Sequence, residues 1–309
     1  MNSYKPEGTI INSVPNQESI SSLKGLERAQ ERGMILEANV VLCDHNFCLH
    51  VSLGGGVRGI IERGEAEYNG EKAKDIAILT RVGKPVCFKV IGFKRASDGG
   101  IVAVLSRRLA QKECMENYIS KLIPGDIIPS RITHLENFGA FVDIGCGIVS
   151  LLSIDAISVS RISHPSARLS IGDNIYTIVK AIDENGRIYV SERELLGSWE
   201  ENAALFSEGE TVRGIVRSVE SYGIFVELKP NLAGLAEFRE DVYVGQSAAV
   251  YIKSIIPEKM KIKLIIIDVQ SREVPPEPLE YFIDAEKVTH IDSWVYSPQN
   301  ASKIIETVF

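Results

Sequence analysis

The sequence predicts a mostly β protein built from tandem five-stranded barrels, and two observations support this. First, the segment from Ile132 to Ile144 recurs in altered form from Val216 to Leu228, and both copies read apolar strand, polar turn, aromatic, glycine, Phe and Val. Second, each copy continues into a glycine followed by an alternating strand, a polar turn and a closing strand. Five short antiparallel strands in about 70 residues fit a small Greek-key barrel of the OB type.

Each hairpin of the repeat has a glycine between two aromatic residues that are three positions apart. On a regular strand such residues point to opposite faces, but a glycine permits a bulge or a positive φ that re-aims one ring. We therefore expect both rings on one outward surface, where unpaired bases stack. The alternative is that the rings belong to the core. The two pairs are Phe138 with Phe141 and Tyr222 with Phe225.

A fainter copy comes first in the chain. In it, Phe47 and His50 take the two aromatic positions, and Cys48 replaces the glycine. The spacing is uneven, since 91 residues separate Phe47 from Phe138 and 84 separate Phe138 from Tyr222. Uneven spacing favours separate barrels on linkers over a solenoid of stacked units.

The repeats divide the chain into five predicted segments. These are an N-terminal extension with an amphipathic helix (1–33), a divergent barrel with its linker (34–121), a barrel with a helical linker (122–204), a third barrel (205–270), and a proline-rich connector with a C-terminal tail that contains a short helix (271–309).

Short helices are expected in the linkers and at both ends. Apolar residues at helical spacing predict a helix from Glu18 to Gly33. In the second linker, Trp199 is expected to anchor neighbouring domains rather than to stack on a base. Three prolines between Arg272 and Glu280 favour an extended connector. Ser297 as N-cap and Pro298 in the first turn predict a C-terminal helix.

Composition narrows the class of protein. The chain has 309 residues, 45% of them hydrophobic, and no apolar run long enough to span a membrane. Its first residues lack the features of a secretion signal, so the cytoplasm is the expected location. Five cysteines without a CxxC pair predict neither a disulfide framework nor a zinc site, and we expect them to be reduced.

The charge argues against tight nonspecific binding to nucleic acid, which depends on neutralised phosphates. The net charge is −7 and the isoelectric point about 5.4. Residues 34–111 have 11 basic and 8 acidic side chains (+3), residues 124–194 have 6 and 9 (−3), and residues 207–270 have 8 and 9 (−1). Local binding remains compatible with these values.

Catalysis has little support in the sequence. The five histidines show no metal-ligand spacing, and no serine or cysteine lies in a nucleophile motif. The run Gly54–Gly56 lacks the Lys-Ser/Thr of a phosphate loop and predicts a β-turn. We therefore expect no enzymatic activity, cofactor, metal or small-molecule substrate.

Several stretches resemble the S1 RNA-binding domain family, in the tandem arrangement of bacterial ribosomal protein S1. The resemblance covers roughly Met34 to Asp268. It implies OB-type barrels with an RNA surface made of two hairpin aromatics, a histidine on the next strand, and an Asp and an Arg that flank the turn before the final strand. The most specific stretches are Val102–Arg108, Asn137–Gly145, His164–Asp173 and Glu194–Val216.

Carried over residue by residue, the resemblance implies a binding patch on the middle barrel and a weaker one on the third. Ser153 and Glu237 stand at the histidine position of these two barrels. We expect Arg131 and Lys180 to supply further cations to the middle patch, and Asp183 with Arg187 could instead form an ordinary surface ion pair. The implied RNA-binding residues are Phe138, Phe141, Asp183 and Arg187 in the middle barrel, and Tyr222, Phe225 and Lys261 in the third, where Pro257 replaces the Asp; Phe47 and His50 are the candidates in the first.

The leading functional hypothesis is a single-stranded RNA-binding protein that acts in translation by holding mRNA at or near the ribosome, with the small ribosomal subunit as a further partner. One alternative is a protein-interaction or ribosome-docking module made of degenerate barrels. Another is an accessory factor that presents RNA to an enzyme of RNA turnover or transcription. The middle barrel is expected to bind RNA best, the third next and the first least.

Overall fold

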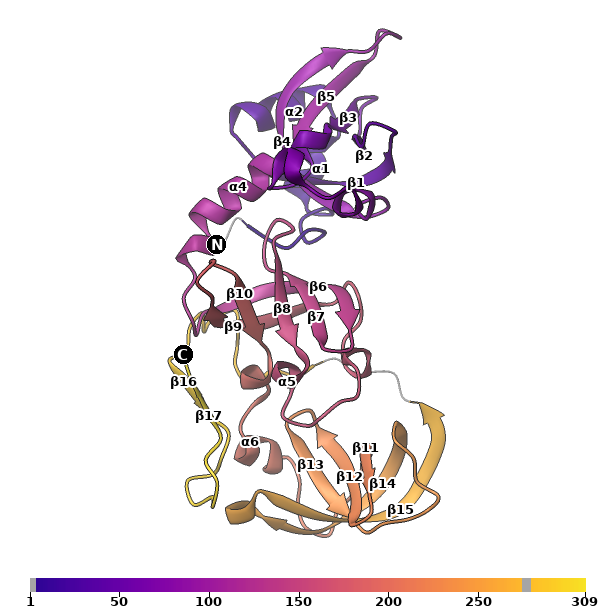
Figure 1. Cartoon of the computed structure of the whole chain (residues 1–309), viewed down its shortest axis with the longest axis vertical. Coiled ribbons are helices and arrows are strands. Elements are labelled where there is room, and N and C mark those ends of the chain that lie inside the picture. Colours follow the sequence, from indigo (N-terminus) through magenta and orange to yellow (C-terminus); the bar gives the residue numbers. More distant parts are fainter. Residues whose placement is uncertain (1–3, 274–278) are drawn as a thin grey trace. The chain divides into compact units, whose positions relative to one another are not determined.

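Three closed five-stranded barrels contain most of the strands of the computed structural model, which describes residues 4–273 and 279–309 (Figure 1). In each barrel the fourth strand pairs with the first, and the fifth closes the barrel between the third and the fourth. The fifth strand runs parallel to the third in all three barrels. The prediction of OB-type barrels is confirmed, but the expectation of antiparallel strands throughout is wrong for this pair. The fourth strand crosses over to the first, so the fifth returns in the direction of the third.

The first barrel is built around a core that includes the fully buried Leu49, Phe88 and Leu105. Between its third and fourth strands lie η1 (Arg63–Glu65), η2 (Gly70–Lys72) and α3 (Asp75–Leu79). Its strands are β1 (Leu36–Cys43), β2 (Leu49–Ser52), β3 (Arg58–Ile61), β4 (Pro85–Arg95) and β5 (Ile101–Ser106).

The N-terminal stripe forms two helices, α1 (Val14–Ile20) and α2 (Leu23–Glu31), where the sequence predicted one. Ser22 interrupts the helix because its side chain accepts a hydrogen bond from the Gly25 N–H and so caps a new helix. The apolar face is as predicted, since Ile20 and Leu26 are buried in the core of the first barrel.

The chain divides into two compact units, each described here by itself. The first comprises residues 1–122 with 129–131 and 143–149, and it includes the linker helices α4 (Arg107–Asn117) and η3 (Ile119–Lys121). The second comprises residues 123–128, 132–142 and 150–309. The middle barrel contributes residues to both units.

The middle barrel has the buried side chains Ile132, Val142, Leu152 and Ile178 in its interior. Its third strand is followed by α5 (Ile154–Ile157) and, further on, by η4 (Pro165–Ala167). Its strands are β6 (Ile127–Glu136), β7 (Gly139–Asp143), β8 (Val149–Ser153), β9 (Asn174–Ile182) and β10 (Ile188–Ser191).

The third barrel encloses Val216, Ile224, Val250 and Leu264, which are buried in one core cluster. A single 3-10 turn, η6 (Pro257–Lys259), connects its last two strands. Its strands are β11 (Thr211–Glu220), β12 (Gly223–Lys229), β13 (Leu232–Ala236), β14 (Gln246–Ile256) and β15 (Lys261–Glu273).

The linker between the middle and third barrels is helical, as predicted. It consists of η5 (Arg193–Leu196) and α6 (Trp199–Ala203), and a capping box between Ser198 and Glu201 begins α6. Trp199 is 2% exposed and belongs to the core cluster of the third barrel. The prediction that this ring is an anchor is confirmed.

The C-terminal tail differs from the sequence prediction. The helix expected after Ser297 is absent, and the tail forms a hairpin of β16 (Ser293–Val295) and β17 (Glu306–Val308). Long-range packing explains the difference, because Trp294 and Tyr296 are buried against the third barrel. The extended connector predicted from Arg272 to Glu280 has its first two residues in β15, and residues 274–278 lie outside the described part of the chain.

Within the second unit, the tail is hydrogen-bonded to the middle barrel and to the linker that follows it. Ile127 N–H donates to the Thr289 carbonyl at 2.9 Å, and Trp199 N–H donates to the Tyr296 carbonyl at 2.9 Å. Gly125 allows a close approach, since a Cβ there would lie 2.3 Å from the Ile291 carbonyl oxygen. The tail is thus part of the folded unit that contains the third barrel.

The described ranges 4–273 and 279–309 contain no helix with the length and apolar character needed to cross a membrane. All five cysteines are free thiols, and Cys87, Cys114 and Cys146 are buried.

Candidate nucleic-acid interface

The turn between β6 and β7 presents two aromatic rings side by side. The ring centroids of Phe138 and Phe141 are 6.1 Å apart, and the ring planes meet at 89°. Phe138 is 54% exposed and Phe141 is partly exposed. The rings are therefore neighbours at the surface, as the glycine between them predicts.

Gly139 is required here because the backbone passes close to the neighbouring strand. A Cβ at this position would lie 2.3 Å from the Leu152 carbonyl oxygen and 2.9 Å from the Ser153 Cα. Gly223 has the same role in the third barrel, where a Cβ would lie 2.6 Å from the Ala236 carbonyl oxygen. No other residue fits without moving the backbone, which explains why both copies of the repeat contain this glycine.

His134 joins the aromatic pair, and the sequence analysis missed it. Its ring stacks on Phe141 with centroids 6.3 Å apart and an interplanar angle of 25°. Its Nε2 lies 2.8 Å from Oε1 of Glu136. The sequence repeat could have indicated this contact. Ser218 pairs with Phe225 in the third barrel, and the corresponding residues of the middle barrel are His134 and Phe141.

Asp183 shapes the β9–β10 turn, and its carboxylate bonds to the backbone. Its Oδ1 accepts from the N–H groups of Asn185 at 2.8 Å and Arg187 at 2.9 Å. Arg187 is exposed, and its guanidinium has no partner among residues 4–273 and 279–309. The alternative of a surface ion pair between these two side chains is therefore wrong, and a contact of Arg187 with RNA stays a prediction.

The two further cations predicted for the middle patch lie in different surroundings. Lys180 is half-buried near Asp155, whose pKa is lowered by a hydrogen bond with Ser153 and further by the charge of Lys180. The guanidinium of Arg131 lies beside Gly8, 3.4 Å from the position of a Cβ there, within the first unit. Arg131 thus belongs to the first unit, and its part in RNA binding stays a prediction.

The third barrel repeats the aromatic pair. The ring centroids of Tyr222 and Phe225 are 6.2 Å apart with an interplanar angle of 85°, and Tyr222 is 69% exposed. Lys261 is exposed at the start of β15, immediately after η6. Glu237, at the position that the resemblance assigns to a histidine, is exposed as well.

The first barrel does not display such a pair. Phe47 adopts a φ of +59° and packs against the barrel core, and the guanidinium carbon of Arg63 lies 5.0 Å above its ring. His50 Nε2 lies 3.1 Å from Oδ2 of Asp44. Phe47 and His50 both remain partly exposed, each with a charged neighbour, and their role in RNA binding stays a prediction.

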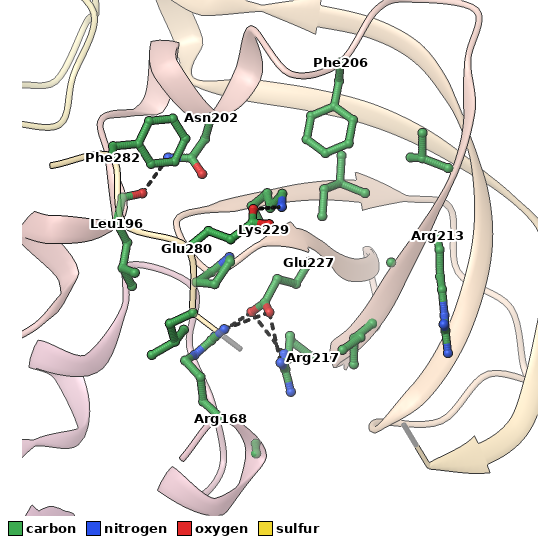
Figure 2. Close-up of a pocket in the computed structure, with 17 residues that line it drawn as sticks. Arg168, Leu196, Asn202, Phe206, Arg213, Arg217, Glu227, Lys229, Glu280 and Phe282 are labelled. Carbon is green, nitrogen blue, oxygen red and sulfur yellow. Dashed lines mark hydrogen bonds and ion pairs between the residues drawn. The ribbon is translucent and has the colours of Figure 1, made fainter. Parts of the chain in front are cut away.

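Figure 2 shows a second polar cluster that the sequence analysis missed, at a cavity of about 530 Å³ beside the third barrel. Arg168 and Arg217 both form paired hydrogen bonds with the carboxylate of Glu227, at 2.7–3.0 Å. Burial alone would raise the pKa of Glu227, but the two guanidinium groups lower it overall. The cluster joins the segment before β9 to the third barrel.

The described part of the chain holds no group of three or more His, Cys, Asp or Glu side chains placed to bind a metal ion.

Comparisons with known proteins point to one class. A family model described as "S1 RNA binding domain" matches residues 121–193. Small ribosomal subunit protein bS1 of Leuconostoc lactis is 29% identical over 229 residues, which is 71% of this chain and 50% of that protein. The bS1 protein of Staphylococcus saprophyticus is 29% identical over 180 residues, 55% of this chain and 44% of that protein. The chain thus resembles bacterial bS1 proteins, as the sequence analysis predicted, and spans about half the length of the curated relatives it matches.

A crystal structure of a multidomain protein with nucleic acid binding domains from Streptococcus pneumoniae aligns with 76% of this chain and 74% of that chain. The identity is 14% and the TM-score 0.25, a likeness too low to carry an argument.

Proposed function

We propose that this chain binds single-stranded RNA, mainly through the β6–β7 hairpin of the middle barrel. The observation that supports this most directly is the exposed pair Phe138 and Phe141, held by Gly139 and extended by the His134 ring. Aromatic rings at the surface of a small barrel stack on unpaired bases whatever their sequence. The segment that matches the S1 RNA-binding domain model includes this hairpin.

Within this proposal, the side chains of the patch contact different parts of the RNA. Phe138 and the stacked pair of Phe141 and His134 receive bases, and the unpaired guanidinium of Arg187 meets a phosphate. Asp183 positions Arg187 through the backbone of the turn. With few cations near the rings, stacking supplies more of the affinity than phosphate neutralisation does.

Within this proposal the protein acts in translation by holding mRNA at or near the ribosome in the cytoplasm, as a binding protein without a cofactor or small-molecule substrate. The names of the bS1 relatives support the ribosomal setting. The small ribosomal subunit is the partner that we propose besides mRNA.

The alternative of a docking module has one observation in its favour. In the first barrel, Arg63 lies over the ring of Phe47 and Asp44 contacts His50, so both candidate side chains already have a charged neighbour. A barrel of this kind is suited to contacts with protein. The third possibility, an accessory factor that presents RNA to an enzyme, shares the RNA surface and differs only in the partner.

The test is to replace Phe138 and Phe141 together by Ala in the full chain and to titrate a labelled single-stranded RNA. We expect affinity to fall by about 1–3 kcal/mol for each lost stack. The exposed Tyr68, 46% accessible and in the first unit, gives the matched control Tyr68→Ala, which should bind as the wild type does.

The thermal unfolding temperature of the same variants shows whether Phe138 and Phe141 belong to the core. It should stay close to that of the wild type if the rings are exposed. If Phe138→Ala/Phe141→Ala binds RNA like the wild type, the site is misassigned. Co-sedimentation with small ribosomal subunits and a labelled single-stranded RNA then separates the functions, because a docking module binds the subunit alone whereas an mRNA-holding protein also carries the RNA with it.

A further inference from the structure

A cavity of about 560 Å³ opens beside the aromatic pair of the third barrel. Tyr222 and Phe225 line it from the third barrel, and the loop of residues 159–161 lines it from the middle barrel. Its volume lies within the usual range of sites for small ligands. The rings of the third barrel therefore face a walled space, with part of the wall contributed by the preceding repeat.

The loop that supplies this wall is firmly held. The Val159 N–H donates to Oδ1 of Asn231 at 2.9 Å, and the Ser160 N–H donates to the Pro230 carbonyl at 3.1 Å. Ser158 Oγ donates to the Ser160 carbonyl within the loop. These bonds fix the loop against the β12–β13 turn, so a ligand meets a wall that is already in place.

The side chain and backbone of Asn231 connect this loop to the linker and the tail. It is fully buried, and its side-chain amide donates to the carbonyls of Arg193 and Gly197 in the linker, both at 2.8 Å. The backbone carbonyl of Asn231 accepts a hydrogen bond from the Tyr296 hydroxyl at 2.7 Å. Loop, linker and tail are thus joined to the third barrel at one residue.

Three charged side chains line the cavity: Arg161, Arg217 and Glu220. Arg161 is exposed, and its guanidinium has no partner among the residues that the structure describes. Arg217 also lines the cavity, but Glu227 engages it. Glu220 is an exposed carboxylate on the same wall, so the phosphate is argued from the geometry of the free guanidinium and not from a net positive charge. A free guanidinium matches the geometry of a phosphate.

We propose that this cavity takes one nucleotide of single-stranded RNA, with its base against Tyr222 and Phe225 and its phosphate against Arg161. The inference rests on the proposed binding of single-stranded RNA and assigns a second, composite subsite for it. Arg161 then contributes a cation from the middle barrel to the cavity that these rings line. One nucleotide contacts two barrels, so neither barrel alone forms the complete subsite.

The experiment uses the full chain with Arg161→Ala, Tyr222→Leu and both together, titrated with a labelled single-stranded RNA of mixed sequence. Each single change should weaken binding, by about 10-fold for Arg161→Ala, the usual range for a hydrogen bond to a charged group. The double variant should lose less than the product of the two effects, because both side chains hold the same nucleotide. Arg161 and Tyr222 are exposed, so unfolding temperatures should stay unchanged.

A salt titration gives a second readout that a structural role would not move. Removing one phosphate contact should make the log–log salt slope shallower by about 0.7. Arg95→Ala is the matched control, since Arg95 is an exposed arginine at the end of β4 in the first barrel and its loss changes the net charge equally.

Equal behaviour of Arg161→Ala and Arg95→Ala, or multiplicative effects of Arg161→Ala and Tyr222→Leu, would overturn the composite subsite. If that happens while Phe138→Ala/Phe141→Ala still weakens binding, the proposed function stands and only this inference fails. If the wild-type chain binds no single-stranded RNA, both the proposed function and the composite subsite are wrong.

Discussion

The first and middle barrels have the same strand order and differ at two corresponding places. One is the hairpin of the first two strands, and the other is the residue that directly follows the last strand, here called the exit. In the first hairpin, Phe47 packs inward beneath Arg63, whereas in the middle one Phe138 and Phe141 are displayed around Gly139. One fold therefore supports either a covered or an open hairpin. The difference lies in a few side chains at the turn.

The exits differ in the kind of ionisable group that is buried there. Arg107 follows Ser106 at the end of β5 and is 0% exposed, and Glu192 follows Ser191 at the end of β10 and is also 0% exposed. Glu7 of the N-terminal segment binds Arg107, and Tyr281 of the C-terminal tail donates to Glu192 at 2.9 Å. In both cases a segment outside the repeats completes the barrel, because a buried ionisable group needs a partner.

The largest effect should come from breaking the exit of the first barrel. Arg107→Ala leaves Glu7 buried without its main counter-charge, and removal of one partner of a buried pair costs about 3–5 kcal/mol. Burial raises the pKa of Glu7, but the charges of Arg107 and Arg81 lower it below its usual range, so the Glu7 carboxylate is ionised at pH 7. Chemical denaturation of the full chain at pH 7 measures the loss. A change below about 1 kcal/mol would mean that the pair is not a stabilising feature.

The exit of the middle barrel should respond to pH instead. Burial raises the pKa of Glu192 from 4.5 to about 8, with Asp173 raising it further and Tyr281 and Arg168 opposing. The unfolded chain releases this proton near pH 4.5, so stability is full below that pH and falls as pH rises through about 8, by about 2–4 kcal/mol.

Glu192→Gln tests this, because Gln keeps an acceptor for Tyr281 and cannot ionise. Its unfolding free energy should exceed that of the wild type at pH 8 and approach it near pH 5. Parallel pH profiles of the two proteins would contradict the assignment. Together with Arg107→Ala, this shows whether the two exits are stabilised by opposite means.

A smaller effect is expected from Gly139→Ala in the open hairpin. The added methyl would meet the backbone of β8 at 2.3 Å, and such overpacking costs about 1–3 kcal/mol. The displaced strand should also separate the two rings and weaken RNA binding. Gly92→Ala is the control, because a Cβ at Gly92 meets nothing within 4 Å. Equal stability of the two variants would show that the hairpin does not depend on its glycine.

Much of the fold could be predicted from local pattern. Alternation along strands, the repeated hairpin and the apolar spacing around Trp199 indicated the barrels and the linker, since each depends on residues close in sequence. The aromatic pairs and their glycines were predicted in the same way. His134 was not predicted, because the resemblance assigns the histidine position to Ser153, although the hairpin register puts His134 opposite Phe141.

The sequence by itself determined the barrels and where their aromatic rings stand, because side-chain alternation and turn geometry are local. Only the tertiary structure decided that Phe47 is covered, that Arg107 and Glu192 are completed by the two ends of the chain, and that the tail is a hairpin. Each of these depends on residues far apart in sequence, such as Arg107 with Glu7 and Glu192 with Tyr281. The burial of Trp294 outweighs the local helix signal at Ser297, since tertiary packing overrides weak local preference.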